Sequence, residues 1–113
     1  MAGDTKAFLE KFNRDMEKMK AAVPDTLRDF GTLFQSVMKN GALTTKQKEL
    51  IALGIAVAQR CGPCIALRVQ KSLEAGNTRE GILEAANVAV VMQGGPAYTH
   101  IPEVMDALDA LAK

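Results

Sequence analysis

Apolar residues recur at intervals of three and four along almost the whole chain, and this spacing restricts the fold more than any other feature. The first such segment covers residues 4–22, with charged side chains on its remaining faces. Five further helices are predicted by the same spacing, together with Pro, Thr, Asn and Gly at their ends. They cover residues 24–39, 44–60, 62–76, 78–93 and 102–111. The sequence therefore predicts an all-α fold.

Composition agrees with helix-on-helix packing and narrows the functions to consider. The 113 residues are 48% hydrophobic but contain no Trp and four Phe, so Ala, Leu, Val and Met supply the core. We expect a single domain over residues 1–113 that gains stability from a partner surface.

A net charge of +1, spread along the chain, does not favour nucleic-acid binding. The N-terminus lacks the pattern of a secretory signal, and the longest mostly apolar run, residues 85–92, is too short for a membrane span, so we expect a cytoplasmic protein.

The segment from Ile82 to Met92 bears on assembly. Only Glu84 and Asn87 interrupt its apolar residues. A helix that is apolar almost all round needs cover on every side. We expect it to be buried, either centrally in one chain or partly against a neighbouring subunit.

The only two cysteines, Cys61 and Cys64, stand three apart around Gly62-Pro63. Pro63 suits the first turn of a helix, so the pair is predicted at a helix N-terminus, at the tip of a helical hairpin. Such a terminus favours a thiolate, and the spacing allows a disulfide, which indicates redox chemistry. Three alternatives remain: packing residues, a zinc site shared between subunits, and a structural disulfide. A thioredoxin fold is excluded because it needs a strand before the motif, where this sequence has helical spacing.

The chain resembles the carboxymuconolactone decarboxylase and alkylhydroperoxidase D-like family over about residues 24–111. The core of the resemblance is the family pattern Glu-x11-Cys-x2-Cys-x3-His, where x is any residue. Glu49, Cys61 and Cys64 match this pattern in type and spacing. The resemblance implies an all-helical fold, assembly into homotrimers or homohexamers, and catalytic roles for these three residues. It also implies reduction of a hydroperoxide or a partner disulfide, with a dithiol protein as the reductant. We expect no metal, no cofactor, no nucleic acid and no membrane partner.

One position departs from the family pattern. Arg68 stands where the redox branch of the family carries the histidine of a proton relay. A guanidinium stays protonated, so Arg68 can hold a thiolate but cannot shuttle a proton. Helix geometry places position 68 about 6 Å along the axis from Cys64, on the side toward Glu49. We therefore expect a Glu49–Arg68 pair beside Cys64.

The single histidine, His100, is a second candidate for the missing proton carrier. It could serve in this role if residues 94–103 fold back over the cysteines, but it could equally be a capping or surface residue. The same alternatives apply to Tyr98. Cys61 is expected to lie nearer the solvent, and Cys64 nearer Arg68. We expect Cys64 to attack and Cys61 to resolve.

Three functions remain open at this point. The first is a thiol redox enzyme that reduces hydroperoxides or partner disulfides through the cysteine pair. The second is the lactone decarboxylase that gives the family its name, a reaction with no evident need for two thiols. The third is a helical scaffold without catalytic activity, whose motif has decayed at Arg68.

Overall fold

The computed structural model describes residues 2–112, and it contains seven helices and no strand in that range. The helices are α1 (Ala2–Ala22), α2 (Pro24–Met38), α3 (Thr45–Ala58), α4 (Gly62–Glu74), α5 (Arg79–Gln93), α6 (Gly95–Tyr98) and α7 (Ile101–Leu111). The prediction of an all-α fold is confirmed. The short α6 was not predicted, because the two glycines and the proline that follow residue 93 indicate a helix end rather than a new helix. None of the described helices is long and apolar enough to cross a membrane.

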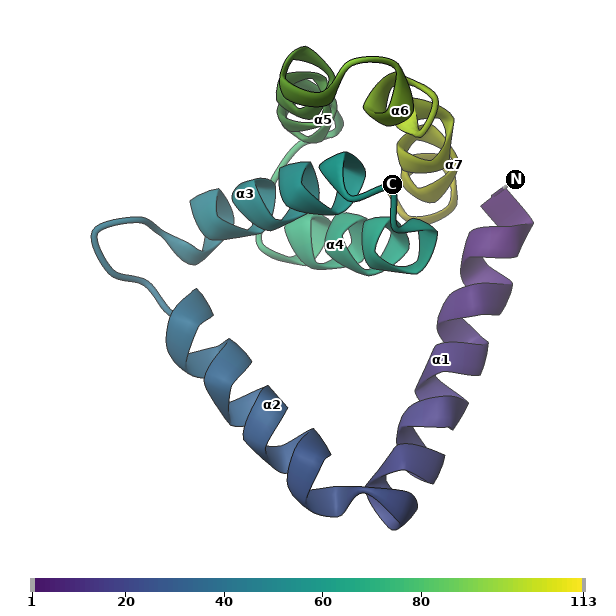
Figure 1. Cartoon of the computed structure of the whole chain (residues 1–113), viewed down its shortest axis with the longest axis vertical. Helices are drawn as coiled ribbons and strands as arrows, with labels where there is room; N and C mark the ends of the chain where they lie inside the picture. The colour runs from purple at the N-terminus through teal and green to yellow at the C-terminus, as the bar shows by residue number, and fades with distance from the viewer. Residues whose placement is uncertain (1, 113) are drawn as a thin grey trace.

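Helices α3, α4, α5 and α7 form the core of the molecule. Helix α3 packs against α4 and α5, and α7 packs against α4 (Figure 1). Their fully buried side chains are almost all aliphatic, as the composition predicts; the largest are Leu53, Val57, Ile65, Val69, Ile82, Val104 and Leu108. The core thus fixes the α3–α4 hairpin from both sides and holds its tip in place.

The turn between α3 and α4 is set by backbone hydrogen bonds. The Arg60 amide donates to the Val57 carbonyl at 3.0 Å, and the Cys61 amide donates to the Ala56 carbonyl at 3.2 Å. Arg60 has φ 57°, the left-handed conformation that closes such a helix end. A residue with a side chain is strained there by about 1–2 kcal/mol. This closure sends the chain directly into α4 at Gly62.

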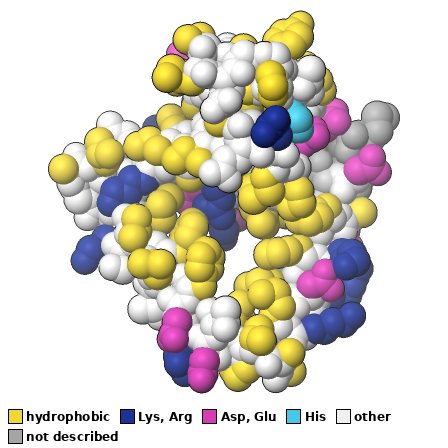
Figure 2. All heavy atoms as spheres, viewed as in Figure 1, with side chains coloured by type: hydrophobic (Ala, Val, Ile, Leu, Met, Phe, Trp, Pro, Cys, Tyr) yellow, Lys and Arg dark blue, Asp and Glu magenta, His cyan; other side chains and the backbone are white. Residues whose placement is uncertain are grey.

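Helices α1 and α2 extend away from the core as two arms (Figure 1). None of the residues of α2 is buried, although its apolar positions are the predicted ones. Phe30, Leu33 and Val37 are 65%, 58% and 56% exposed. Figure 2 shows apolar side chains along the inner sides of both arms. Most of the apolar face of α2 therefore lies open to solvent in the described chain.

Helix α5 is only half covered within the chain. Ile82, Ala86 and Ala89 are buried against the core, whereas Val91 and Met92 are 83% and 76% exposed. Of the two expected arrangements, full burial within one chain does not apply to the outer face of this helix, and cover by a neighbouring subunit stays a prediction. Within the chain, α5 packs mainly against α3, α6 and α7.

Candidate redox site

Cys61 and Cys64 form a disulfide at the N-terminus of α4. Their Cα atoms lie 5.2 Å apart. Cys61 is the N-cap residue, and its Sγ accepts a hydrogen bond from the Cys64 amide at 3.3 Å. Pro63 occupies the first turn, where its missing N–H leaves no gap in the helix. The free amides of this helix end would favour a thiolate once the disulfide is reduced.

The two cysteine residues differ in exposure to solvent. Cys64 is exposed, whereas Cys61 is half-buried. The expectation that Cys61 lies nearer the solvent is therefore wrong. The physical reason is that Cys61 caps the helix and is folded into the hairpin turn, while Cys64 sits on the outer side of the first turn.

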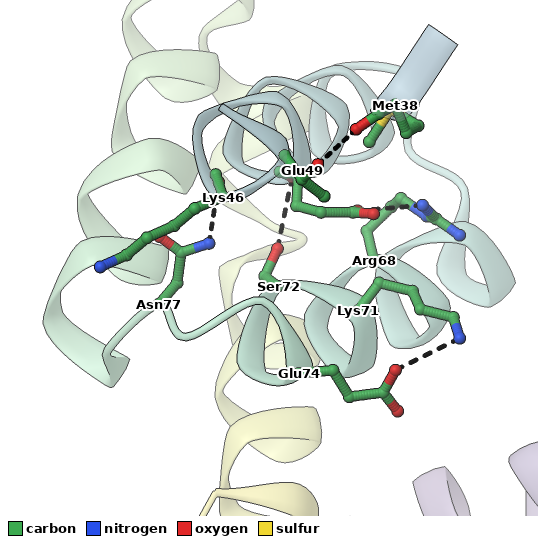
Figure 3. Close-up of polar contacts among 9 residues, drawn as sticks. Met38, Lys46, Glu49, Arg68, Lys71, Ser72, Glu74 and Asn77 are labelled. Carbon is green, nitrogen blue, oxygen red and sulfur yellow. Dashed lines mark hydrogen bonds and ion pairs between the residues drawn. The ribbon is translucent and has the colours of Figure 1, made fainter. Parts of the chain in front are cut away.

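Glu49 and Arg68 form an ion pair between the two helices of the hairpin. Arg68 Nη1 lies 3.0 Å from Glu49 Oε1 (Figure 3). The side chains are 6% exposed for Glu49 and 17% exposed for Arg68. The predicted pairing of these two residues is confirmed. This burial shows that neither side chain is a solvated surface charge.

Two further side chains hold the pair in place, and sequence reasoning did not identify either one. Ser72 is fully buried, and its hydroxyl donates to the Glu49 carbonyl at 3.3 Å (Figure 3). The ring of Phe34, from α2, lies 4.8 Å from the Arg68 guanidinium carbon, a cation–π contact. Ser72 follows Arg68 by four residues, so the helix period could have placed it on the same face. Phe34 lies too far away in sequence for such a signal.

The environment of Glu49 acts on its carboxyl in two opposing ways. Burial raises the pKa of Glu49 above its ordinary value of 4.5, and the Arg68 guanidinium lowers it; burial is the larger effect. A proton is therefore bound more tightly in the folded chain than in the unfolded chain. The stability that this group contributes is full below the ordinary pKa and falls as the pH rises through the raised pKa.

This sign leads to a stability prediction for the Glu49→Gln variant. The free energy of unfolding of the wild type, minus that of the variant, should fall as the pH rises from about 4 through the raised pKa, then level off. Urea unfolding of the oxidised proteins across this range measures the difference. Asp15→Asn is the matched control, because Lys11 lowers the pKa of the exposed Asp15 carboxyl. The free energy of unfolding of the wild type, minus that of Asp15→Asn, should therefore fall as the pH decreases. A flat Glu49 difference would contradict the prediction.

His100 precedes α7 as its N-cap residue. Its Nδ1 donates to the Pro96 carbonyl at 2.7 Å, and its Nε2 faces Glu103 Oε1 at 4.0 Å. Tyr98 is 67% exposed. The contacts of His100 thus connect it to Glu103 rather than to Cys61 or Cys64. Among the described residues, no three or more His, Cys, Asp or Glu side chains are grouped to hold a metal ion.

The fold and site together define a class: an all-helical protein with a cysteine pair at the tip of a hairpin and a buried ion pair one turn behind it. The sequence pattern of the carboxymuconolactone decarboxylase family matches residues 24–112. The chain belongs to this family.

Known structures and sequences agree with this assignment. A crystal structure of a carboxymuconolactone decarboxylase family protein from Legionella pneumophila superposes with a TM-score of 0.92 at 33% identity, covering 97% of this chain and 98% of that one. A second family member, from Thermotoga maritima, with a suggested part in the antioxidative response, has a TM-score of 0.79 at 26% identity and coverages of 91% and 87%. An uncharacterized protein of the cox locus of Paracoccus denitrificans is 35% identical over 103 residues, or 85% of this chain and 93% of its own length.

Proposed function

We propose that the protein is a thiol-dependent redox enzyme that reduces a hydroperoxide or a partner disulfide through Cys61 and Cys64. The observation that carries the proposal is the disulfide at the N-terminus of α4, with Cys64 exposed to an incoming substrate. A disulfide across one helical turn is the product expected from such a reaction. The suggested antioxidative part of the Thermotoga maritima relative supports the same chemistry.

The proposed reaction with a hydroperoxide has two steps. The Cys64 thiolate attacks the terminal peroxide oxygen, the O–O bond breaks, and an alcohol leaves with the thiol proton. The Cys61 thiol then attacks the sulfenic acid, the S–S bond forms, and water leaves. Two thiols and one hydroperoxide thus give one disulfide, one alcohol and one water. A dithiol reductant protein restores both thiols by thiol–disulfide exchange.

The Glu49–Arg68 pair has a supporting role in this proposal. Arg68 follows Cys64 by four residues on the same face of α4, so its fixed positive charge can stabilise the Cys64 thiolate. Glu49 holds the guanidinium through its 3.0 Å hydrogen bond, and Phe34 covers it from the other side. Since Arg68 cannot release its proton, this pair tunes the sulfur rather than carrying protons.

The proposal is tested by intact mass and thiol counting on the reduced protein. One equivalent of an organic hydroperoxide is added, and samples are taken over seconds to minutes. Rapid loss of both thiols and of two hydrogens supports the redox function. If both thiols are still free after minutes, the peroxidase reaction is wrong, and a matched assay with a small disulfide decides whether exchange is the activity.

We further propose that copies of this chain assemble with one another, as homotrimers or homohexamers, through the uncovered apolar surfaces. Helices α3 and α5 border a groove of about 410 Å³ whose lining has no charged residue. Its lining residues are Leu50, Ile51, Gly54, Ile55, Ala58, Ala85, Val88, Ala89 and Met92. The face of α2, a helix with no buried residue, is likewise apolar and could pack against this groove. Docking of α2 from one copy against the groove of another would cover both surfaces.

A further inference from the structure

Glu103 of α7 lies against the turn that joins the two cysteines. A methyl group on Gly62 would stand 3.0 Å from Glu103 Oε2. Such a distance is shorter than ordinary van der Waals contact, so the carboxylate reaches the turn because residue 62 has no side chain. Gly62 directly follows Cys61 and is the first residue of α4. The sequence separates Glu103 from this turn by about forty residues, and the packing of α4 on α7 brings them together.

The Glu103 side chain lines a cavity of about 350 Å³ beside the cysteine turn. The cavity is lined by residues of α1, α4 and α7, namely Asp4, Thr5, Phe8, Gly62, Pro63, Ala66, Glu103 and Asp106. The Glu103 side chain is 46% exposed. It can therefore exchange a proton with water between turnovers, which the buried Glu49 cannot do as easily.

His100 sets the surroundings of Glu103. The Pro96 carbonyl can only accept, so Nδ1 of His100 carries the proton at 2.7 Å, and Nε2 is directed toward Glu103 at 4.0 Å. Two further carboxylates line the same cavity, Asp4 from α1 and Asp106 from α7, and Gly62 and Pro63 of the cysteine turn border it. The described surroundings thus offer a histidine on one side of the carboxylate and the cysteine turn on the other.

We propose that Glu103 takes the proton of the Cys61 thiol when the pair closes and delivers it to the departing hydroxide. This inference rests on the proposed redox function. Arg68 cannot perform the transfer because it stays charged, and Glu49 is bound to Arg68. Glu103 thus supplies the acid–base group that the family pattern places at position 68.

The step balances in atoms and electrons. The Cys61 sulfur attacks the Cys64 sulfenic sulfur, the S–S bond forms, and the S–O bond breaks. The thiol proton passes to the Glu103 carboxylate and then to the leaving hydroxide, which departs as water. Glu103 ends the step ionised, as it began.

The test is the rate of disulfide closure in the reduced Glu103→Gln variant after one equivalent of an organic hydroperoxide. The first thiol should disappear as in the wild type, whereas the second should disappear about 10²-fold more slowly. A 1,3-diketone that traps sulfenic acids should then label Cys64 in the variant.

The sign of the effect separates proton transfer from simple electrostatics. Removing a negative charge beside a thiol favours the thiolate, so a purely electrostatic role predicts faster closure in Glu103→Gln. Asp106→Asn removes a carboxylate from the same cavity and should change the closure rate less than about 3-fold. Equal slowing in both variants would overturn the proposal, as would unchanged or faster closure in Glu103→Gln.

A further variant keeps the test decisive. Gly62→Ala retains every charge but displaces the Glu103 carboxylate, and it should slow closure about 3- to 10-fold even if Glu103→Gln folds poorly. If the wild type consumes no hydroperoxide, the proposed redox function itself fails. If the wild type consumes hydroperoxide but Glu103→Gln and Asp106→Asn close the disulfide at the same rate, only the role of Glu103 fails.

Discussion

Replacing either cysteine by serine is expected to lower hydroperoxide turnover at least ~10³-fold, the largest effect on activity that the structure predicts. The physical reason is that a serine hydroxyl is not ionised near neutral pH and cannot form a disulfide. The two variants should fail differently. Cys64→Ser should leave the hydroperoxide untouched, whereas Cys61→Ser should react once and stop as a sulfenic acid on Cys64. Steady-state turnover with a dithiol reductant, combined with intact mass, measures both results.

Three outcomes would contradict the proposed roles of the cysteines. A sulfenic acid trapped on Cys61 of the Cys64→Ser variant would reverse the attacking and resolving residues. Unchanged lactone turnover in the double Cys61→Ser, Cys64→Ser variant, without hydroperoxide consumption by the wild type, would assign the decarboxylase reaction instead. If the wild type shows neither hydroperoxide consumption nor lactone turnover, and its thiols do not react, the scaffold hypothesis is favoured.

Placing a charge on the apolar face of α2 is expected to break the assembly into single chains. In Leu33→Glu, each interface would bury an unpaired carboxylate where the wild type buries a leucine worth roughly 1.5–3 kcal/mol. Light scattering after gel filtration should show a multiple of the chain mass for the wild type and about 12.1 kDa for the variant. Val88→Glu, in the groove of α3 and α5, should have the same effect.

Gln35→Glu is the matched control for this experiment. It places the same charge on α2 at an exposed polar position and should leave the mass of the assembly unchanged. A wild type that remains a single chain at high concentration would contradict the assembly. A Leu33→Glu variant with the mass of the wild type would show that α2 is not the helix that docks.

The sequence predicted the parts of the site that depend on the geometry of single helices. The Glu49–Arg68 pair follows from the rise along two antiparallel helices and from the match to the family spacing, and the structure confirms it. Thr44 and Thr78 cap α3 and α5, in agreement with the predicted helix starts at residues 44 and 78, because capping is local chemistry. Such features need only residues that are close in the chain.

Other features of the site depend on how whole helices pack, and periodicity does not contain that information. The approach of Glu103 to Gly62 requires the position of α7 against α4, and the contact of Phe34 with Arg68 requires the direction of α2. The exposed outer face of α5 has the same origin. A uniformly apolar pattern indicates that a helix is covered, but it does not distinguish cover within one chain from cover by another copy.

The contact between Phe34 and Arg68 links the quaternary structure to the chemistry of the thiols. Phe34 belongs to α2, the helix proposed to dock on another copy, while Arg68 lies one turn after Cys64. A change in the position of α2 would therefore alter the environment of the guanidinium and, through it, the reactivity of Cys64. Assembly and catalysis are then thermodynamically coupled, so activity per chain should fall on dilution below the dissociation concentration of the assembly. Turnover measured over a dilution series, alongside mass, would follow both changes in one experiment.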